Sequence, residues 1–387
     1  MKRILSAVLA AAMLTAPALA VTPLEGSDIT LSAPSAILIE CSTGEVIYEK
    51  NAREHMSPAS VTKVMTMLLV AEAVDSGAIA LEDEVTASAR AASMGGSQIW
   101  LEEGETMSVG EMLKCVAVVS ANDCCVALAE YISGSEEAFV ARMNERAVQL
   151  GMEDTHFTCC SGLLESDDHY SCARDIAVMS RELLRHEWIR DYTTVWMDTI
   201  RNGEFTLANT NKLIYYYKGA TGLKTGFTTR AMYCLSASAM RDGVEYIAVV
   251  LHAPTSQERF ESAKTLLDYA FANYTLADPA GSCALPAMSV RLGQSAFLQP
   301  ELAEGGKILI PRSLSASLSY ELELPDEVTA PVLERQILGK MFVHADGKLM
   351  QEIPVIAPDA VGRLGTFDIF LALLRCALGC EVSPGGE

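Results

Sequence analysis

The spacing of apolar and polar positions divides the chain into segments of different character. Residues 36–51, "AILIECSTGEVIYEKN", contain two β-rich runs around a Ser-Thr-Gly turn and predict a hairpin. Residues 59 to about 186 show mostly helical periodicity, with predicted stops at four glycines. Three β-rich runs follow, "TGLKTG", "AMYCLSASAMRDG" and "VEYIAVVLHAP", and then one helix, "SQERFESAKTLLDYAFANY". The four glycines are Gly77, Gly104, Gly134 and Gly151.

This order of segments predicts an α+β fold. The hairpin and the three later strands can share one antiparallel sheet, with the helical block set beside it, so we expect a first domain over residues 21–275. The sequence "TLADPAGSCALP" at 275–286 has the composition of a linker. Beyond it, residues 313–324, "SLSASLSYELEL", alternate with period two and predict a half-buried strand. Residues 285–358 therefore read as a small all-β domain.

The two ends of the chain have their own patterns. Residues 1–20 combine a basic start, an apolar run and the small-residue exit Ala18-Leu19-Ala20, which predicts a secretory signal peptide cleaved after Ala20 rather than a short buried helix. The apolar tail at 359–387 is interrupted by Asp368 and Arg375, so it is far short of the roughly 20 residues that span a bilayer. It is either an amphipathic anchor lying in the membrane interface or a helix that packs back on the protein.

Charge and cysteine content narrow the function classes. The chain has 29 basic and 50 acidic residues, and removal of the leader with Lys2 and Arg3 gives a net charge near −23. Such a charge, with no basic block to offset it, argues against a nucleic-acid partner. The 11 cysteines mostly lie in apolar contexts and are either reduced core thiols or partly disulfide-bonded. The sequence contains neither a CxxC pair nor a histidine pair at helical spacing, so it does not indicate a zinc site.

A single charged residue stands out in the apolar run at 57–74, "SPASVTKVMTMLLVAEAV". Ser60 and Lys63 are three apart at the start of a predicted helix and therefore share one face. The apolar surround disfavours the ammonium form of Lys63, which would then be able to take a proton from Ser60 and make it a nucleophile. The alternative is that Lys63 has no catalytic role and that its head group reaches out of the helix into solvent.

Two later patterns strengthen the catalytic interpretation. Ser120-Ala121-Asn122 is predicted at the end of an apolar helix, where a second hydroxyl and an amide can relay a proton and hold a substrate amide. Lys224-Thr225-Gly226 is predicted at the start of a strand, where a cation and a hydroxyl can hold a substrate carboxylate and Gly226 allows close approach of backbone. Each pattern alone is common, but the three in this order are a strong signal.

The chain resembles a known family at these residues, the low-molecular-weight penicillin-binding serine D-Ala-D-Ala carboxypeptidases of peptidase family S11. The resemblance covers nearly the whole chain: "PASVTKVMT", "SAN", "SGL…HYSCARD", "LANTNKLIYYYKGATGLKTGFT", the small β domain and the anchor-like tail. It implies a β-lactamase/transpeptidase-like domain followed by the small β domain. The family pattern is less well matched at Cys159, Cys160, Ser161 and Cys172.

The resemblance also implies a role for each site residue. Ser60 would be the acyl-forming nucleophile, Lys63 its base and Ser120 the proton relay. Asn122 would bind a substrate amide, and Lys224 with Thr225 and Gly226 would form the carboxylate site, assisted by Arg259. Backbone N–H groups of Ser60 and Phe227 would form the oxyanion hole.

The activity implied is removal of the terminal D-alanine from peptidoglycan stem peptides that end in D-Ala-D-Ala, on the outer face of the cell membrane or in the cell wall. No metal or organic cofactor is expected, and β-lactams would acylate the same serine. A class A β-lactamase shares the three motifs, but the expected Glu-x-x-Leu-Asn pattern is not in "MEDTHFTCCSGLLESDD". Two further hypotheses are a catalytically silent cell-wall scaffold and an endopeptidase that cuts cross-links.

Overall fold

The computed structural model describes residues 29–377 except residue 165. The predicted signal peptide lies outside these residues. The chain divides after Thr275 into two compact units, which are described separately. Each unit has its own hydrophobic core.

The first unit is built on a five-stranded sheet in the order β2-β1-β9-β8-β7, with every neighbouring pair antiparallel. The predicted hairpin forms β1 and β2, and the three later runs form β7, β8 and β9. Segments about 200 residues apart in the sequence therefore pair directly, as Leu38 does with Ala248. The bounds are β1 (Ser35–Glu40), β2 (Val46–Lys50), β7 (Ala220–Thr228), β8 (Met232–Arg241) and β9 (Val244–Ala253).

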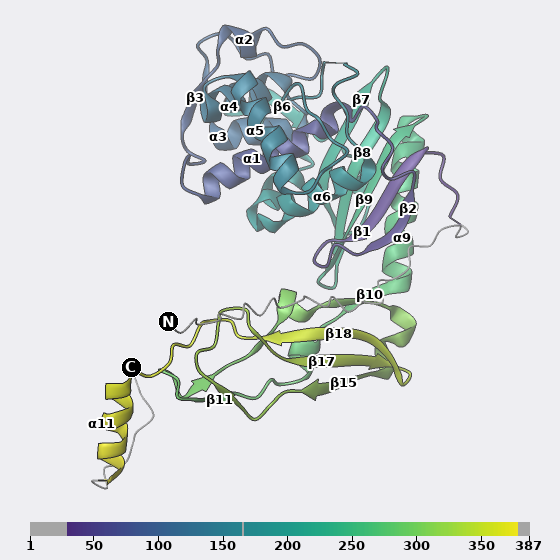
Figure 1. Cartoon of the computed structure of the whole chain (residues 1–387). Helices are drawn as coiled ribbons and strands as arrows, with labels where there is room; N and C mark the ends of the chain where they lie inside the picture. The colour runs from purple at the N-terminus through teal and green to yellow at the C-terminus, as the bar shows by residue number, and fades with distance from the viewer. Residues whose placement is uncertain (1–28, 165, 378–387) are drawn as a thin grey trace, which may run out of the picture. The chain divides into compact units, whose positions relative to one another are not determined.

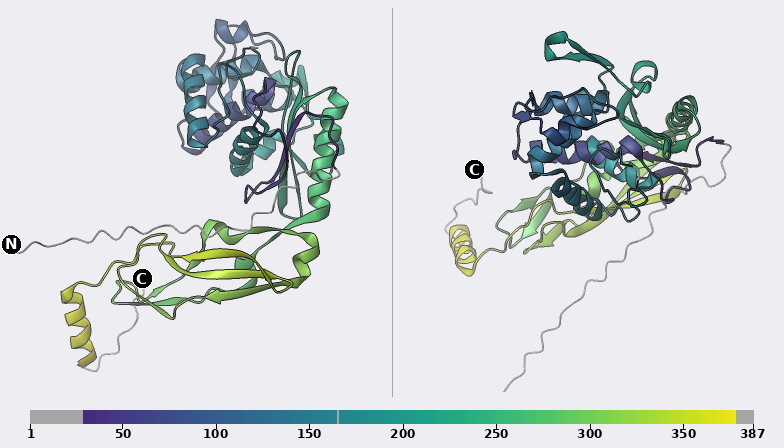
Figure 2. Two further views of the ribbon diagram at one scale, coloured as in Figure 1. Left: turned by 45° about the vertical axis from the view of Figure 1, so that its right-hand side comes forward. Right: turned by 90° about the horizontal axis from the view of Figure 1, so that it is seen from above.

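Helices cover both faces of this sheet (Figure 1), so the first unit has the predicted α+β class but three layers, where the sequence predicts only a helical block beside the sheet. The helical block lies on one face, where α6 packs against β1 and β9, and α9 packs against β8 and β9 on the other. Figure 2 shows the same layers from two further directions. The bounds are α1 (Lys63–Asp75), α2 (Ala89–Ala92), α3 (Val109–Val118), α4 (Asn122–Ser133), α5 (Glu136–Gln149), α6 (Ala173–Arg185), α7 (Arg190–Thr193), α8 (Leu213–Tyr216) and α9 (Ser256–Asn273).

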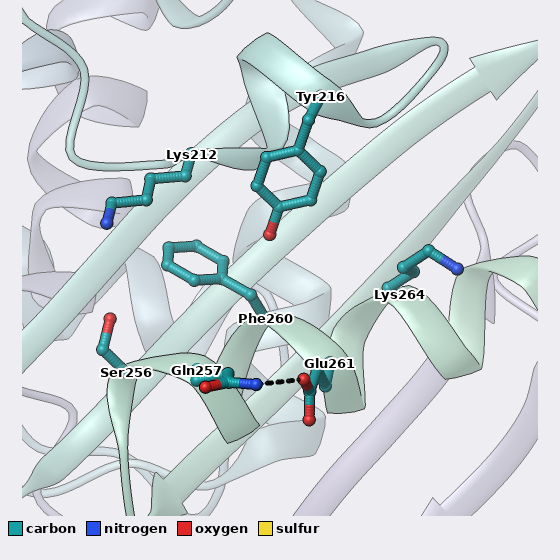
Figure 3. A pocket seen from close by; sticks show the side chains of 7 residues that line it. All are labelled: Lys212, Tyr216, Ser256, Gln257, Phe260, Glu261 and Lys264. Atoms are coloured by element: carbon teal, nitrogen blue, oxygen red, sulfur yellow. Dashed lines mark hydrogen bonds between the residues drawn. The ribbon is translucent and has the colours of Figure 1, made fainter.

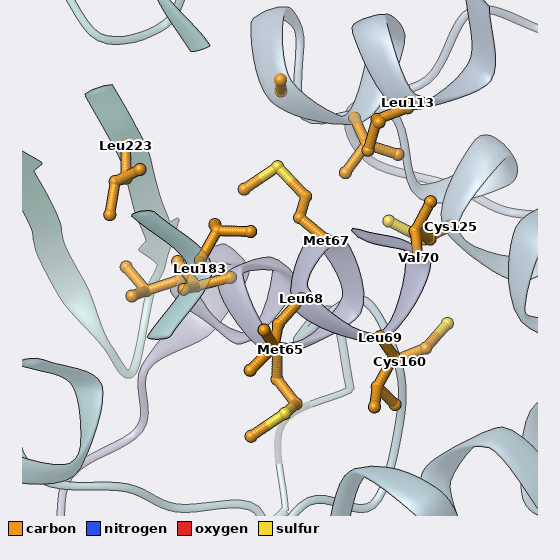
Figure 4. Packing of buried hydrophobic residues seen from close by; sticks show 14 of the residues in the cluster. Met65, Met67, Leu68, Leu69, Val70, Leu113, Cys125, Cys160, Leu183 and Leu223 are labelled. Atoms are coloured by element: carbon orange, nitrogen blue, oxygen red, sulfur yellow. The ribbon is translucent and has the colours of Figure 1, made fainter. Parts of the chain in front are cut away.

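Helix α1 lies at the centre of the helical block. It is apolar on all sides, which is typical of a helix buried in a core rather than one on a surface. Its side chains point in different directions towards residues of neighbouring elements (Figure 4), and Met65, Met67 and Leu68 are fully buried. Burial of one such side chain contributes roughly 1.5–3 kcal/mol. The apolar run in the sequence is therefore the axis on which the block is packed.

Three of the four predicted glycine stops end helices. Gly134 is the C-cap of α4 with φ +81°, and Gly77 and Gly151 follow α1 and α5 with similar positive φ values that glycine adopts at little cost. Gly104 instead lies in a turn before β4, because residues 84–108 contain a short strand pair that helical periodicity does not reveal. Two such pairs flank the helices: β3 (Glu84–Thr86) with β4 (Thr106–Ser108), and β5 (Met197–Ile200) with β6 (Phe205–Ala208).

The second unit is all-β apart from short helical turns and one C-terminal helix, so the predicted small β domain is confirmed. Its four-stranded sheet has the order β13-β18-β17-β15, and its three-stranded sheet has the order β12-β11-β16. The bounds are β10 (Tyr274–Ala277), α10 (Pro279–Ser282), β11 (Met288–Arg291), β12 (Phe297–Leu298), β13 (Glu301–Leu302), β14 (Ile308–Pro311), β15 (Leu318–Glu323), β16 (Glu327–Thr329), β17 (Ile337–Ala345), β18 (Lys348–Ile356) and α11 (Thr366–Ala377).

The strand predicted at 313–324 is only half correct. Residues Arg312–Ser317 form a 3-10 helix, and strand β15 begins at Leu318. The cause is local: the hydroxyl of Ser315 donates to the carbonyl of Arg312 (2.8 Å) and that of Ser317 to the carbonyl of Leu314 (3.1 Å). Such side-chain bonds to nearby backbone compete with strand pairing. Alternation alone does not distinguish this turn from the strand that follows it.

The predicted tail contains helix α11, and residues 378–387 lie outside the described part of the chain. Phe367, Phe370 and Leu374 are 69%, 58% and 44% exposed. Their spacing of three and four residues places them on one face of the helix. Among the helices of the described residues, none has the length and apolar character needed to cross a membrane.

Candidate active site

Ser60 lies in a 3-10 turn, Ala59–Thr62, that runs directly into α1 at Lys63. The turn begins with Ala59 at φ +46°, a conformation that a non-glycine residue adopts only under constraint from its surroundings. One turn further on, the Nζ of Lys63 lies 2.9 Å from the Oγ of Ser60 and donates a hydrogen bond of 2.7 Å to the carbonyl of Ser161. The turn therefore brings a hydroxyl and an amine into direct contact.

Lys63 is fully buried, which is unusual for a lysine. Burial lowers the pKa of its amine below the usual value, because an ammonium ion loses its hydration inside the protein. Within the described residues it has no ion pair to offset that loss. A buried amine in contact with a serine hydroxyl is suited to accept the hydroxyl proton.

Ser120 and Asn122 lie between α3 and the start of α4. Ser120 has φ +66°, and its buried Oγ has no hydrogen-bond partner among the described residues. The amide nitrogen of Asn122 donates to the carbonyl of Gly95 at 2.8 Å, while its Oδ1 is also buried and without a partner in the described structure. Buried polar atoms without partners are rare, so these two oxygens indicate a place where a ligand or water completes the bonding.

The Lys224-Thr225-Gly226 motif lies in the second half of β7, so its predicted position at the start of a strand is wrong. The strand begins at Ala220, because residues 220–223 already pair with β8. Lys224 is buried, and its Nζ donates to the carbonyl of Thr225 at 3.2 Å. Burial lowers the pKa of Lys224 well below its usual value, and the nearby charge of Lys63 lowers it further. The two lysines are therefore close enough to repel each other.

Thr225 and Gly226 connect the motif to its surroundings. The hydroxyl of Thr225 donates to that of Thr210 at 2.7 Å. A Cβ on Gly226 would lie 2.7 Å from the carbonyl oxygen of Pro58, which is closer than side chains allow, and at a tight 3.2 Å from the backbone nitrogen of Ser60. Glycine here permits β7 to touch the Ala59–Thr62 turn. The strand and the turn therefore meet at Gly226 and Ser60.

Arg259 lies in the first turns of α9 and is only 6% exposed. Its guanidinium donates to the carbonyls of Gly226 (3.2 Å) and Cys234 (3.3 Å), and burial lowers its pKa to about 10. It also lies over the ring of Phe260, 4.5 Å from the centroid. Arg259 therefore connects α9 to the end of β7 through its hydrogen bond to the Gly226 carbonyl.

A pocket of about 530 Å³ lies beside Arg259, between α8 and α9 (Figure 3). Its lining residues include Lys212, Tyr216, Ser256 and Phe260, and Figure 3 shows the Gln257–Glu261 hydrogen bond at one side. None of the nine predicted site residues lines it. The pocket therefore does not coincide with the chemistry built around Ser60.

Among the described residues, one cluster of side chains has donor atoms close enough to hold a cation. Atoms of Asp154, Cys172 and Asp175 lie within 4.8 Å of one another. The carboxylate of Asp175 already accepts the Asp154 N–H (2.8 Å) and the Thr155 hydroxyl (2.7 Å), and Cys172 caps helix α6. These bonds give the cluster a structural role at the start of α6.

Sequence reasoning missed several residues that shape the site. They are the backbone carbonyl of Ser161, the buried His169 that contacts Thr62 at 2.8 Å, Thr210, and Gly162, where a Cβ would lie 1.9 Å from the carbonyl oxygen of Ala59. The nine cysteines whose side chains are described are free thiols.

Comparison with known proteins gives a consistent result for both units. Residues 21–255 match the family model of D-alanyl-D-alanine carboxypeptidases, peptidase S11, and residues 287–363 match the C-terminal domain of penicillin-binding protein 5. The chain is 42% identical to D-alanyl-D-alanine carboxypeptidase DacF of Bacillus subtilis, over 98% of each chain.

Solved structures agree with the sequence comparison. Penicillin-binding protein 5 from Haemophilus influenzae superposes with a TM-score of 0.76 and 29% identity, over 88% of this chain and 100% of that chain. Penicillin-binding protein D2 from Listeria monocytogenes, solved in an ampicillin-bound form, gives 0.58 and 32% identity over 63% of this chain and 100% of that chain.

These matches define the protein as a serine hydrolase of the penicillin-binding class. More narrowly, the chain belongs to peptidase family S11, the D-alanyl-D-alanine carboxypeptidases. The predictions of family, fold class and enzyme class are thereby confirmed. Membership in this family also decides against a class A β-lactamase.

Proposed function

We propose that this enzyme removes the terminal D-alanine from peptidoglycan stem peptides through an acyl-enzyme on Ser60. One observation carries the proposal: the fully buried amine of Lys63 lies 2.9 Å from the Ser60 hydroxyl, and burial lowers its pKa. A serine next to a neutral amine is an activated nucleophile.

In the first step the amine of Lys63 takes the proton of Ser60 as Oγ bonds to the penultimate D-alanine carbonyl carbon. The C–N bond to the terminal D-alanine then breaks, and the leaving amine receives the proton through Ser120. The unpartnered Oγ of Ser120 and Oδ1 of Asn122 support these roles, because they leave a hydroxyl and an amide free to bond with substrate.

Substrate is held along β7 in this mechanism. Lys224 and Thr225 receive the terminal carboxylate, and Arg259 fixes the Gly226 carbonyl next to them. The developing oxyanion bonds to the backbone N–H groups of Ser60 and Phe227, and the close approach at Gly226 supports that pairing. Removing one such donor costs about 100- to 1,000-fold in other hydrolases.

In the second step water attacks the ester carbonyl, its proton passes to Lys63, and the ester bond breaks to restore the Ser60 hydroxyl. A β-lactam presents a strained amide with a nearby carboxylate, and Ser60 would open it to give the same kind of ester. The ampicillin-bound relative from Listeria monocytogenes supports binding of β-lactams here.

The test is release of D-alanine from an acyl-D-Ala-D-Ala peptide. We expect release by the wild type, none by Ser60→Ala, and wild-type rates for Ser76→Ala, an exposed serine at the far end of α1. Unchanged activity of Ser60→Ala would refute the mechanism. Rapid turnover of penicillin without D-alanine release would instead favour a β-lactamase, and inertness in both assays a non-catalytic scaffold.

We also propose that the protein is exported and contacts the membrane surface through α11. The leader-like sequence at 1–20 supports export, and the exposed face formed by Phe367, Phe370 and Leu374 supports insertion into the interface. Burial of such an apolar face among lipid head groups and acyl chains stabilises the membrane-bound state.

A liposome sedimentation assay tests the membrane contact. Phe367→Ser with Phe370→Ser should abolish binding to anionic vesicles, and Leu333→Ser, which alters a side chain 67% exposed elsewhere in the same unit, should leave it unchanged. Equal binding by the double variant would show that α11 does not insert.

A further inference from the structure

A buried histidine joins the turn that contains the proposed nucleophile, Ala59–Thr62 (the nucleophile turn), to a second segment of the site. His169 is 2% exposed, and its Nε2 lies 2.8 Å from the Oγ1 of Thr62. Its Nδ1 accepts the backbone N–H of Thr158 at 3.0 Å, so the ring proton is on Nε2 and is donated to Thr62. Burial lowers the pKa of His169 to about 4, which is consistent with a neutral ring at pH 7.

The segment that begins at Thr158 supplies the second contact of the catalytic amine. We call residues 158–163 the Ser161 segment, because the Ser161 carbonyl accepts the hydrogen bond from Lys63. Thr66 on α1 holds the same segment by donating to the Cys160 carbonyl at 2.5 Å. At Gly162, with φ +71°, the segment lies directly on Ala59. The Ser161 carbonyl is therefore held by ties to α1 and to the nucleophile turn.

The two residues that His169 bonds, Thr62 and Thr158, lie close in the sequence to Lys63 and Ser161. Thr62 lies between Ser60 and Lys63 in the sequence, and Thr158 is three residues before Ser161. Any buried histidine needs partners for both ring nitrogens, and here the two partners belong to these two segments.

We infer that His169 is a positioning residue, which by joining Thr62 to Thr158 holds the Ser161 carbonyl against the Lys63 amine. With one hydrogen bond of the amine fixed on that carbonyl, the amine keeps its orientation towards Ser60. A misplacement of about 1 Å in such an arrangement can cost on the order of 100-fold in rate. This inference rests on the proposed roles of Ser60 and Lys63, and His169 itself contacts neither substrate nor the reacting atoms.

The experiment measures acylation by a fluorescent penicillin in a stopped-flow instrument, which separates the acylation rate constant from the half-saturating concentration. His169→Phe keeps a ring of similar size but loses both nitrogens, and we expect a roughly 10- to 100-fold lower rate constant with little change in half-saturation. His169→Gln retains a donor and an acceptor and should recover much of the loss. Thr62→Val should resemble His169→Phe.

A double-mutant cycle provides the decisive comparison. Because His169 acts through Thr62, the combined variant should lose no more than either single variant, whereas independent effects would add. Leu266→Ala removes a buried side chain of α9 outside this network and should lower the melting temperature without changing the acylation rate constant.

The failing outcomes are distinct. A folded His169→Phe that acylates at the wild-type rate, or losses that add in the double variant, would overturn the positioning role. Failure of the wild type itself to be labelled would instead overturn the proposed function. If His169→Phe does not fold, Thr62→Val decides the question. Acylation by Thr62→Val at the wild-type rate would overturn the inference. An acylation rate constant of Thr62→Val that stays low at saturating penicillin and at lower temperature would support it.

Discussion

The turn between β1 and β2 contains a carboxyl group that we expect to make the protein less stable as the pH rises. Glu45 is largely buried, and its Oε2 has no hydrogen-bond partner among the described residues. Burial, with a further contribution from the charge of Glu40, raises the pKa of Glu45 from 4.5 to about 7. The folded state therefore keeps a proton between pH 4.5 and 7 that the unfolded chain has already lost.

The free energy of unfolding must fall across this interval, because the folded state binds more protons than the unfolded state. At about 1.4 kcal/mol for each tenfold change in proton affinity, the full loss is about 3 kcal/mol above pH 7. Partial exposure to solvent reduces this to roughly 1–3 kcal/mol. Glu45→Gln has no proton to lose, so its advantage over the wild type should be small at pH 5 and reach that range at pH 8.

Tryptophan fluorescence during urea unfolding is a suitable assay, since all three tryptophans, at positions 100, 188 and 196, belong to the first unit. Glu103→Gln, at an exposed position, is the control and should differ from the wild type by the same small amount at both pH values. A stability difference for Glu45→Gln that does not change between pH 5 and pH 8 would refute the argument. Acylation should be unaffected by the substitution, because Glu45 lies outside the site.

Two substitutions of residues next to the Ala59–Thr62 turn give further tests. Lys63→Arg should abolish penicillin labelling while keeping the positive charge, because a guanidinium does not give up its proton at accessible pH; wild-type labelling would show that Lys63 is not the base. Gly162→Ala should destabilise the first unit by more than about 2 kcal/mol and slow acylation, because its Cβ would lie 1.9 Å from the Ala59 carbonyl oxygen at φ +71°. Gly151→Ala, which also has a positive φ but nothing within 4 Å, is the matched control and should cost less.

Most elements of the fold can be predicted from the pattern of apolar and polar residues. Alternation and helical periodicity predict the bounds of the hairpin, the helical block, the three later strands and α9 to within a few residues. Each of these elements buries one face, so its apolar residues recur at a regular spacing. The strand pairs β3–β4 and β5–β6 are not predicted, since three or four residues are too few to show a period. The 3-10 turn at Arg312–Ser317 is not predicted either, because serine bonds to the backbone leave no trace in a pattern of polarity.

At the site, the sequence identifies side chains but not the backbone groups that orient them. Ser60 and Lys63 are recognisable, because a lysine in an apolar run is costly to bury and its spacing of three from a serine is typical of a nucleophile and its base. The Ser161 carbonyl that fixes Lys63 is 98 residues away, and any residue type could supply it. His169 is likewise unpredictable, since a single histidine in a loop carries no sign of the turn to which it will bond.

The ionic surroundings of the two buried lysines bear on the proposed roles of Lys63 as a base and of Lys224 as a ligand for a carboxylate. No described residue forms an ion pair with Lys63 or Lys224. The thiol of Cys125, which interacts with both lysines, stays neutral because burial raises its pKa to about 12, and the carboxylate of Asp123 is occupied by the N–H groups of residues 99 and 101. The charge of Lys63 lowers the pKa of Lys224, so the two ammonium forms disfavour each other. When a substrate carboxylate reaches Lys224 in the proposed mechanism, it stabilises that charge alone, and Lys63 remains the amine without a counter-ion, ready to accept the proton of Ser60.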